Sequence, residues 1–206
     1  MTKEHIIFDL DGTLSNTAKA TMMAITEAEK QLDLPKVTEN QVRDAMGLAG
    51  LEFYEYLYPQ VLKETLLDIE NIVDAAEEAA VKVVGKEILF PGIVDMLAGL
   101  LKKGCFLYIA STGSKSHVYN TLRACDIEKF FTEVSCGESE KISMVKRIIA
   151  GRNLNEWAMV GDMHKDSDAA RGNKILALGA GYGYLNKDDF PLFDFILSRP
   201  IDIFCY

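Results

Sequence analysis

Residues 6–14 read IIFDLDGTL, and this stretch decides the fold that we expect for the chain. It begins as a short apolar strand and ends in a polar turn, where Asp9 and Asp11 flank one apolar residue and Gly12 permits a sharp change of direction. The pattern Asp-x-Asp-Gly-Thr arises by chance in roughly one chain of several hundred of this length. A loop that caps a helix is the plainer interpretation, and the apolar strand directly before the pattern weakens it.

Outward from this stretch, the sequence changes rhythm. From about residue 17 to residue 85 it reads as successive helices, and Thr38 and Gln41 have the spacing of a capping box. Further on, apolar strands alternate with helices. Strands are expected at 105–111, 132–136, 157–162 and 175–180, and helices at 91–104, 114–125, 141–152 and 166–173.

This alternation predicts a parallel sheet with helices on both faces, an α/β fold of the Rossmann-like kind. The helical stretch interrupts the series after its first strand. We therefore expect a core formed by residues 1–14 and 88–206, and an inserted all-helical cap domain at residues 15–87.

Composition limits the function classes. The chain has 206 residues, 49% of them hydrophobic, and a net charge of −9, which argues against nonspecific binding to nucleic acid or to an anionic membrane. The four cysteines lack zinc-ligand spacing, and neither a signal peptide nor a long apolar span is visible. We expect a cytoplasmic protein with reduced thiols, present as a monomer or homodimer.

Reactive side chains stand where the expected strands end, which is where open parallel sheets place their sites. Ser111 ends the strand at 105–111, Asp162 ends the strand at 157–162, and Asp166 follows four residues later. Asp162 could also be a helix N-cap, although the Asp-x-Asp-Gly-Thr pattern favours a functional role. A lysine, Lys141, opens the helix at 141–152.

Three segments in this order resemble the haloacid dehalogenase superfamily, in particular its phosphoglycolate phosphatase-like branch with a helical cap. They are IIFDLDGTL, LFPGIVDMLAGLLKKGCFLYIAS at 89–111 and MVGDMHKDSDAARGN at 159–173. The resemblance implies that Asp9 is a nucleophile that forms an acyl phosphate, and that Asp11 is the general acid and then the base. It also implies Mg²⁺, held by Asp9, the Asp11 carbonyl and Asp162.

The resemblance assigns the phosphate contacts as well. Ser111 is expected to hydrogen-bond a phosphoryl oxygen, with Thr112 as a rival and Gly12 as a further contact. Lys141 should neutralise the transferring phosphoryl group, supported by Asp166, although the proline that often follows this lysine is absent. Lys146 is the rival lysine, more than a helical turn further along.

We thus expect a magnesium-dependent phosphatase that acts on a small phosphorylated metabolite such as phosphoglycolate, a nucleotide or a sugar phosphate. A phosphosugar mutase resembling β-phosphoglucomutase is the main alternative, and a phospho-receiver or binding module is a distant one. Residues 46–53, around Gly47 and Gly50, are the expected cap loop that faces the site. His5 and His117 are given no role.

Overall fold

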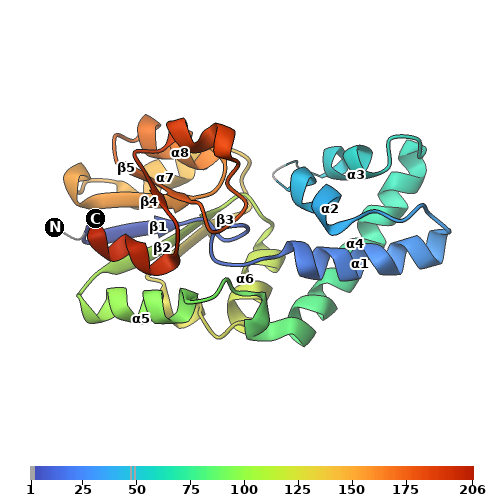
Figure 1. Ribbon diagram of the computed structural model, residues 1–206, viewed down its shortest axis with the longest axis horizontal. Helices are drawn as coiled ribbons and strands as arrows, with labels where there is room; N and C mark the ends of the chain where they lie inside the picture. The colour runs from blue at the N-terminus through green and yellow to red at the C-terminus, as the bar shows by residue number, and fades with distance from the viewer. Residues whose placement is uncertain (1–2, 47, 49) are drawn as a thin grey trace. The chain divides into compact units, whose positions relative to one another are not determined.

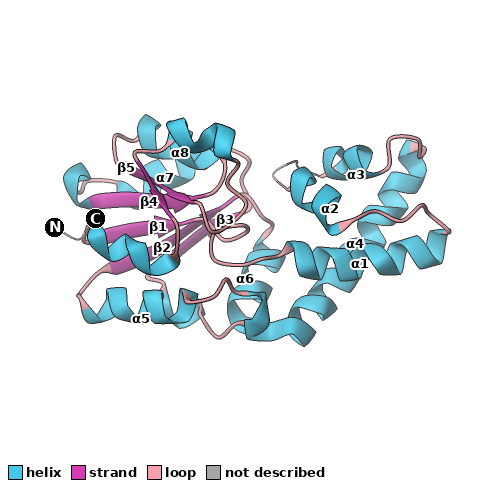
Figure 2. Cartoon of the chain, in the orientation of Figure 1, coloured by secondary structure: helices cyan, strands magenta, loops and turns pink. Residues whose placement is uncertain are grey.

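The computed structural model describes residues 3–46, 48 and 50–206 (Figures 1 and 2). The chain divides into two compact units, one made of Met1–Asn16 with Leu89–Tyr206 and the other of Thr17–Ile88. We call them the core unit and the helical unit. That the helical unit acts as a cap stays a prediction.

The core unit is built on a six-stranded sheet in the order β3-β2-β1-β4-β5-β6, in which all neighbouring strands are parallel. The strands are β1 (His5–Phe8), β2 (Phe106–Ser111), β3 (Glu133–Cys136), β4 (Trp157–Gly161), β5 (Leu176–Ala180) and β6 (Phe195–Leu197). The expected parallel α/β fold is confirmed. Strand β6 was not expected, because three residues are too short to show a pattern and their extended state comes from pairing with β5.

Helices cover both faces of this sheet, with α7 and α8 on one face and α5 on the other (Figure 1). The core helices are α5 (Ile93–Lys102), α6 (Lys115–Ala124), α7 (Lys141–Ile149) and α8 (His164–Gly172), joined by the 3₁₀ turns η2 (Glu128–Phe130), η3 (Leu154–Glu156), η4 (Lys187–Leu192) and η5 (Pro200–Cys205). Several bounds differ from expectation by one to three residues. Helix α7 ends at Ile149, and α8 begins at His164, because Met163 rather than a later residue is its N-cap.

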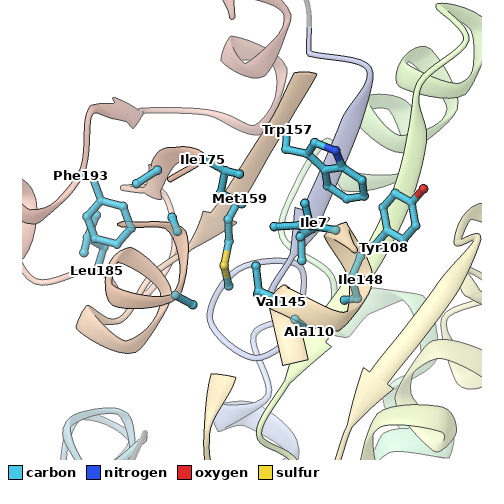
Figure 3. Close-up of a cluster of buried hydrophobic side chains, with 14 residues drawn as sticks. Ile7, Tyr108, Ala110, Val145, Ile148, Trp157, Met159, Ile175, Leu185 and Phe193 are labelled. Carbon is cyan, nitrogen blue, oxygen red and sulfur yellow. The ribbon is translucent and has the colours of Figure 1, made fainter. Parts of the chain in front are cut away.

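A buried apolar cluster fixes α7 and α8 to the sheet (Figure 3). Ile7 and Met159 point from the central strands toward Val145 on α7, and the rings of Tyr108 and Trp157 lie 5.0 Å apart. Each large apolar side chain that is fully buried contributes about 1.5–3 kcal/mol through loss of exposed apolar area. The carboxyl ends of β1, β2 and β4 are therefore held on a rigid frame.

The described residues of the helical unit form α1 (Ala18–Leu32), α2 (Glu39–Ala45), α3 (Leu51–Leu57), α4 (Lys63–Val84) and the 3₁₀ turn η1 (Gly85–Ile88). The expected capping box is confirmed, since the Gln41 N–H donates to Thr38 Oγ1 at 3.3 Å and the Thr38 N–H donates to Gln41 Oε1 at 2.9 Å. Within this unit the long helices α1 and α4 pack against each other. Gly47 of the expected cap loop lies outside the described residues.

A buried carboxylate links the helices of this unit. Glu29 of α1 accepts hydrogen bonds from the Val37 N–H at 2.7 Å and from the Tyr58 hydroxyl at 3.5 Å, so its burial is compensated. No helix in the described part of the chain has both the length and the apolar character needed to cross a membrane. The four cysteines are free thiols.

Candidate active site

The turn after β1 places two carboxylates at the carboxyl end of the central strand. The Asp9 N–H donates to the Val160 carbonyl at 2.9 Å, which continues the pairing of β1 with β4. Gly12 follows with φ +80°, and a Cβ there would lie 2.2 Å from Asp162 Oδ2, so the close approach requires glycine. The Gly12 N–H donates to the Ser15 carbonyl at 2.8 Å. A phosphate would have to compete with that bond, and the phosphate contact assigned to Gly12 stays a prediction.

Lys141 connects two of the acidic side chains. It is the first residue of α7, it is buried, and its Nζ lies 2.8 Å from Asp9 Oδ1 and 2.7 Å from Asp166 Oδ1. Burial alone would lower the pKa of Lys141, but the charges of Asp166 and Asp9 outweigh it and the pKa is raised. The rival Lys146 is exposed on the same helix. The structure thus brings Lys141, and not Lys146, to the acidic group.

Asp166 is fixed from its other side by the backbone. Its Oδ2 accepts from the N–H groups of Asp162 at 3.1 Å and Met163 at 2.9 Å, in the first turn of α8. This carboxylate therefore ties the end of β4 to Lys141. The sequence predicted the pairing with Lys141 but not the contacts with the backbone.

Asp162 is as deeply buried as Asp166, with 1% of its surface exposed. The Thr13 hydroxyl donates to its Oδ1 at 2.6 Å, whereas its Oδ2 is buried and has no hydrogen-bond partner among the described residues. The alternative role as N-cap of α8 is excluded, because Met163 holds that position. Thr13 was given no role from the sequence, although it is the threonine of the Asp-x-Asp-Gly-Thr pattern.

The electrostatics of this group favour a cation. Burial raises the pKa of Asp9 to about 7, with the Asp166 charge adding to the rise and Lys141 opposing it. Burial and the charges of Asp9 and Asp166 likewise raise the pKa of Asp162 well above its ordinary value. Three carboxylates each have an oxygen within 4.8 Å of the others, and one ammonium group pairs with two of them. An orphaned carboxylate oxygen in an all-oxygen cluster with excess negative charge fits Mg²⁺.

The end of β2 supplies the hydroxyl candidates. Ser111 is buried, and its Oγ accepts from the Gly113 N–H at 3.1 Å, whereas Thr112 is exposed. The N-cap of α6 is Ser114, so neither of the two candidate residues has that role. Their contact with a phosphate stays a prediction.

A histidine for which the sequence indicates no function contacts one of the acidic residues. His117 was given no role, yet its Nε2 lies 3.0 Å from Asp11 Oδ1 and 3.1 Å from Asp11 Oδ2. The two residues are 106 positions apart, and no spacing rule links them. The one sequence feature that could have indicated this contact is the position of His117 in the first turn of the helix that follows β2. Tyr182 was also missed, and burial together with the Asp162 charge raises the pKa of its phenol.

The profile of the haloacid dehalogenase-like hydrolases matches residues 6–180. The chain therefore belongs to this family. It is 25% identical to a phosphoglycolate phosphatase of Agrobacterium fabrum (strain C58 / ATCC 33970), over 96% of this chain and 88% of that protein. It is 30% identical to the tyrosine-protein kinase PtkA of Mycobacterium tuberculosis (strain ATCC 25618 / H37Rv), over 89% of this chain but only 64% of that protein.

A solved structure described as a "predicted phosphoglycolate phosphatase" from Haemophilus somnus 129pt matches the fold with a TM-score of 0.87. The match covers 100% of this chain and 98% of the chain in that structure, at 22% sequence identity. At this identity the likeness concerns the fold, and it agrees with the family match.

Proposed function

We propose that this hydrolase is a magnesium-dependent phosphatase that cleaves a small phosphomonoester through a phospho-aspartyl intermediate on Asp9. The observation that carries the proposal is the series of ion pairs Asp9–Lys141–Asp166 beside an Asp162 oxygen that has no hydrogen-bond partner among the described residues. These residues place a carboxylate, a buried cation and a hard-oxygen ligand at the carboxyl end of a central strand.

In the first half of the reaction, a carboxylate oxygen of Asp9 attacks phosphorus. The bond from phosphorus to the ester oxygen breaks, its electron pair leaves with that oxygen, and Asp11 donates the proton that makes it an alcohol. Lys141 lies within hydrogen-bond distance of Asp9, and its charge offsets the negative charge that gathers there.

In the second half, the Asp11 carboxylate takes a proton from water, and the water oxygen attacks phosphorus. The bond from Asp9 to phosphorus breaks, and its electron pair returns to the Asp9 carboxylate, which leaves inorganic phosphate. Ser111 is buried at the end of β2, where its hydroxyl can donate to a phosphoryl oxygen. Asp166 holds Lys141 in place throughout.

Asp9, the Asp11 carbonyl and Asp162 would hold Mg²⁺, which supplies charge neutralisation for the phosphoryl oxygens when it is bound. The oxygen of Asp162 without a hydrogen-bond partner in the described residues supports this assignment. The names of the phosphoglycolate phosphatase relatives favour a small phosphorylated carboxylic acid as substrate. The monomeric or dimeric state and a cytoplasmic location stay predictions.

The test compares wild-type protein with Asp9→Asn, using Asp168→Asn as a matched control, because Asp168 is exposed on α8. With Mg²⁺ present, the enzyme should release phosphate from small phosphomonoesters, and Asp9→Asn should lose about 1,000-fold or more in kcat while Asp168→Asn keeps it. Near-normal turnover by Asp9→Asn, with deamidation excluded by mass spectrometry, would refute the covalent route. A hexose 1-phosphate that is isomerised rather than hydrolysed would indicate a mutase.

A further inference from the structure

A histidine that the function proposed above does not use lies against the proposed general acid. His117 Nε2 is almost equidistant from the two oxygens of Asp11, at 3.0 and 3.1 Å. Both residues belong to the core unit, and their side chains are 18% and 27% exposed for His117 and Asp11, respectively. The contact is therefore partly shielded from water, and a hydrogen bond there is stronger than it would be at an open surface.

The imidazole ring is itself held in position. His117 is the third residue of α6, and its N–H donates to the Oγ of the N-cap Ser114 at 3.2 Å. The ring lies close to Gly113, where an added Cβ would be 3.1 Å from His117 Cδ2 and would crowd it. The backbone of His117 is therefore anchored at the start of α6, and its ring lies beside Gly113.

Asp11 needs such a constraint. Its side chain is partly exposed and stands in the turn after β1. A general acid must lie within hydrogen-bond reach of the leaving oxygen, and misplacement by about 1 Å can cost about 100-fold in rate. Each carboxyl oxygen can accept more than one hydrogen bond, so a bond from His117 leaves the protonated carboxyl able to donate to the leaving oxygen, and the carboxylate able to accept from water afterwards.

We propose that His117 is a positioning residue for Asp11, and that its Nε2–H holds the Asp11 carboxyl in the orientation that protonates the leaving oxygen. The inference rests on the proposed function, because it assumes that Asp11 is the acid. It adds a residue from α6 to a constellation otherwise drawn from β1, β2, α7 and the β4–α8 junction.

The first test measures alcohol release in the first turnover of an alkyl phosphate, with Mg²⁺ present. His117→Ala should slow this step by about 10- to 100-fold, the usual size of losing a partner that orients a reactive group. His117→Phe keeps a ring of similar size but has no N–H donor, so it should be as slow as His117→Ala. It also keeps the test decisive if the alanine variant fails to fold. His117→Gln can still donate an N–H and should recover most of the rate.

Arg123→Ala is the matched control, because Arg123 is exposed near the other end of α6 and pairs with Glu128. It should leave the first-turnover rate unchanged. A glutamine variant as slow as the phenylalanine variant would overturn the proposal, since the hydrogen bond would then not be what matters.

The second test changes the leaving group. The phenol of 2,4-dinitrophenyl phosphate leaves without needing a proton, so the His117 variants should release it within about threefold of the wild-type rate. A purely structural role of His117 would slow both esters equally, and that result would also overturn the proposal.

The third test separates this inference from the proposed function. In an Asp11→Asn background, His117→Ala should cost less than about twofold more, because a residue that acts through another has no independent effect. Full alkyl phosphatase activity of Asp11→Asn would overturn the assignment of the acid itself. If Asp11→Asn lost activity while the separate variants His117→Ala and His117→Phe kept it in full, only the positioning role would be overturned.

Discussion

Lys141 is the residue on which the charge balance of the site depends. A buried ammonium group is costly unless it is paired, and here both of its neighbours are carboxylates that are themselves buried. Removal of Lys141 leaves two buried carboxylates without a cation, whereas removal of either carboxylate leaves Lys141 paired with the other one. The effects of single substitutions in this group should consequently be strong and non-additive.

We expect Lys141→Ala to lower kcat more than Asp166→Ala does, because the first removes the cation and the second only its support. Loss of Asp166 should cost about 10- to 100-fold. The double variant should be little worse than Lys141→Ala alone. Steady-state phosphate release with saturating Mg²⁺ measures all three.

Lys146→Ala is the control for this series, because Lys146 is exposed on the same helix. It should be nearly silent. If Lys146→Ala lost activity while Lys141→Ala kept it, the role of neutralising the phosphoryl group would belong to Lys146 and not to Lys141.

Asp162 should be stabilising only when a cation is bound. Its Oδ2 is buried without a partner in the described residues, and its raised pKa shows that the ionised form is disfavoured in the metal-free fold. Asp162→Asn should therefore raise the Tm of the protein in chelator, by about 2–4 °C for each kcal/mol gained. It should also remove most of the Tm increase that Mg²⁺ produces in wild-type protein.

Differential scanning calorimetry with and without Mg²⁺ measures both effects, and Asp168→Asn provides the matched control. A lower Tm for Asp162→Asn in chelator would contradict the expected relief of charge repulsion.

For single residues, the sequence predicted the positions of the acidic side chains well, because a turn directly after an apolar strand places Asp9 and Asp162 at strand ends. It failed for His117, since the contact with Asp11 arises from the packing of α6 and has no local pattern. The interpretation of the residues as nucleophile, acid and ligand stays a prediction that the variants test.

Among the secondary-structure elements, the junction of β4 and α8 does the most to shape the site. Strand β4 ends at Gly161, and the chain turns so tightly into α8 that Asp166 folds back over it. A Cβ at position 161 would lie 2.1 Å from Asp166 Cγ. The glycine is needed here for space rather than for an unusual backbone angle.

Gly161→Ala should push Asp166 away from Lys141 and lower kcat by about 10- to 100-fold, as direct loss of Asp166 would. It should also destabilise the fold by about 1–3 kcal/mol through overpacking. Activity assays and chemical denaturation measure the two effects separately.

Gly151→Ala is the comparison, because Gly151 has φ +79° and no atom would lie within 4 Å of the added Cβ. It should cost about 1 kcal/mol of backbone strain and leave kcat intact. A fully active Gly161→Ala would show that Asp166 can move without harm.

The alternation of strands and helices was predictable because each element is long enough to show its own periodicity. The ends of the elements were less predictable. Helix α8 is an example, because its start depends on the hydrogen bond from the Met163 N–H to the Asp166 carboxylate. Strand β6 was not predictable, since it owes its state to a neighbour in the sheet.

For the whole molecule, activity should depend almost completely on Mg²⁺. Chelator should abolish phosphate release and Mg²⁺ should restore it, whereas Ca²⁺ should restore it poorly, because its looser coordination does not hold the required geometry. The measurement is phosphate release after exhaustive chelation and stepwise addition of each metal. Full activity in metal-free protein would contradict the role assigned to Asp162.

The sheet order has a consequence for how the chain is made. The ribosome completes β1 first, yet its partners along the sheet are β2 and β4, which pair His5 with Phe106 and Trp157. The middle of the sheet therefore cannot close until Trp157 has emerged, and long-range pairing of this kind is slow. Until then, the apolar residues 6–8 stay exposed in the growing chain, and we expect chaperones to bind them during synthesis.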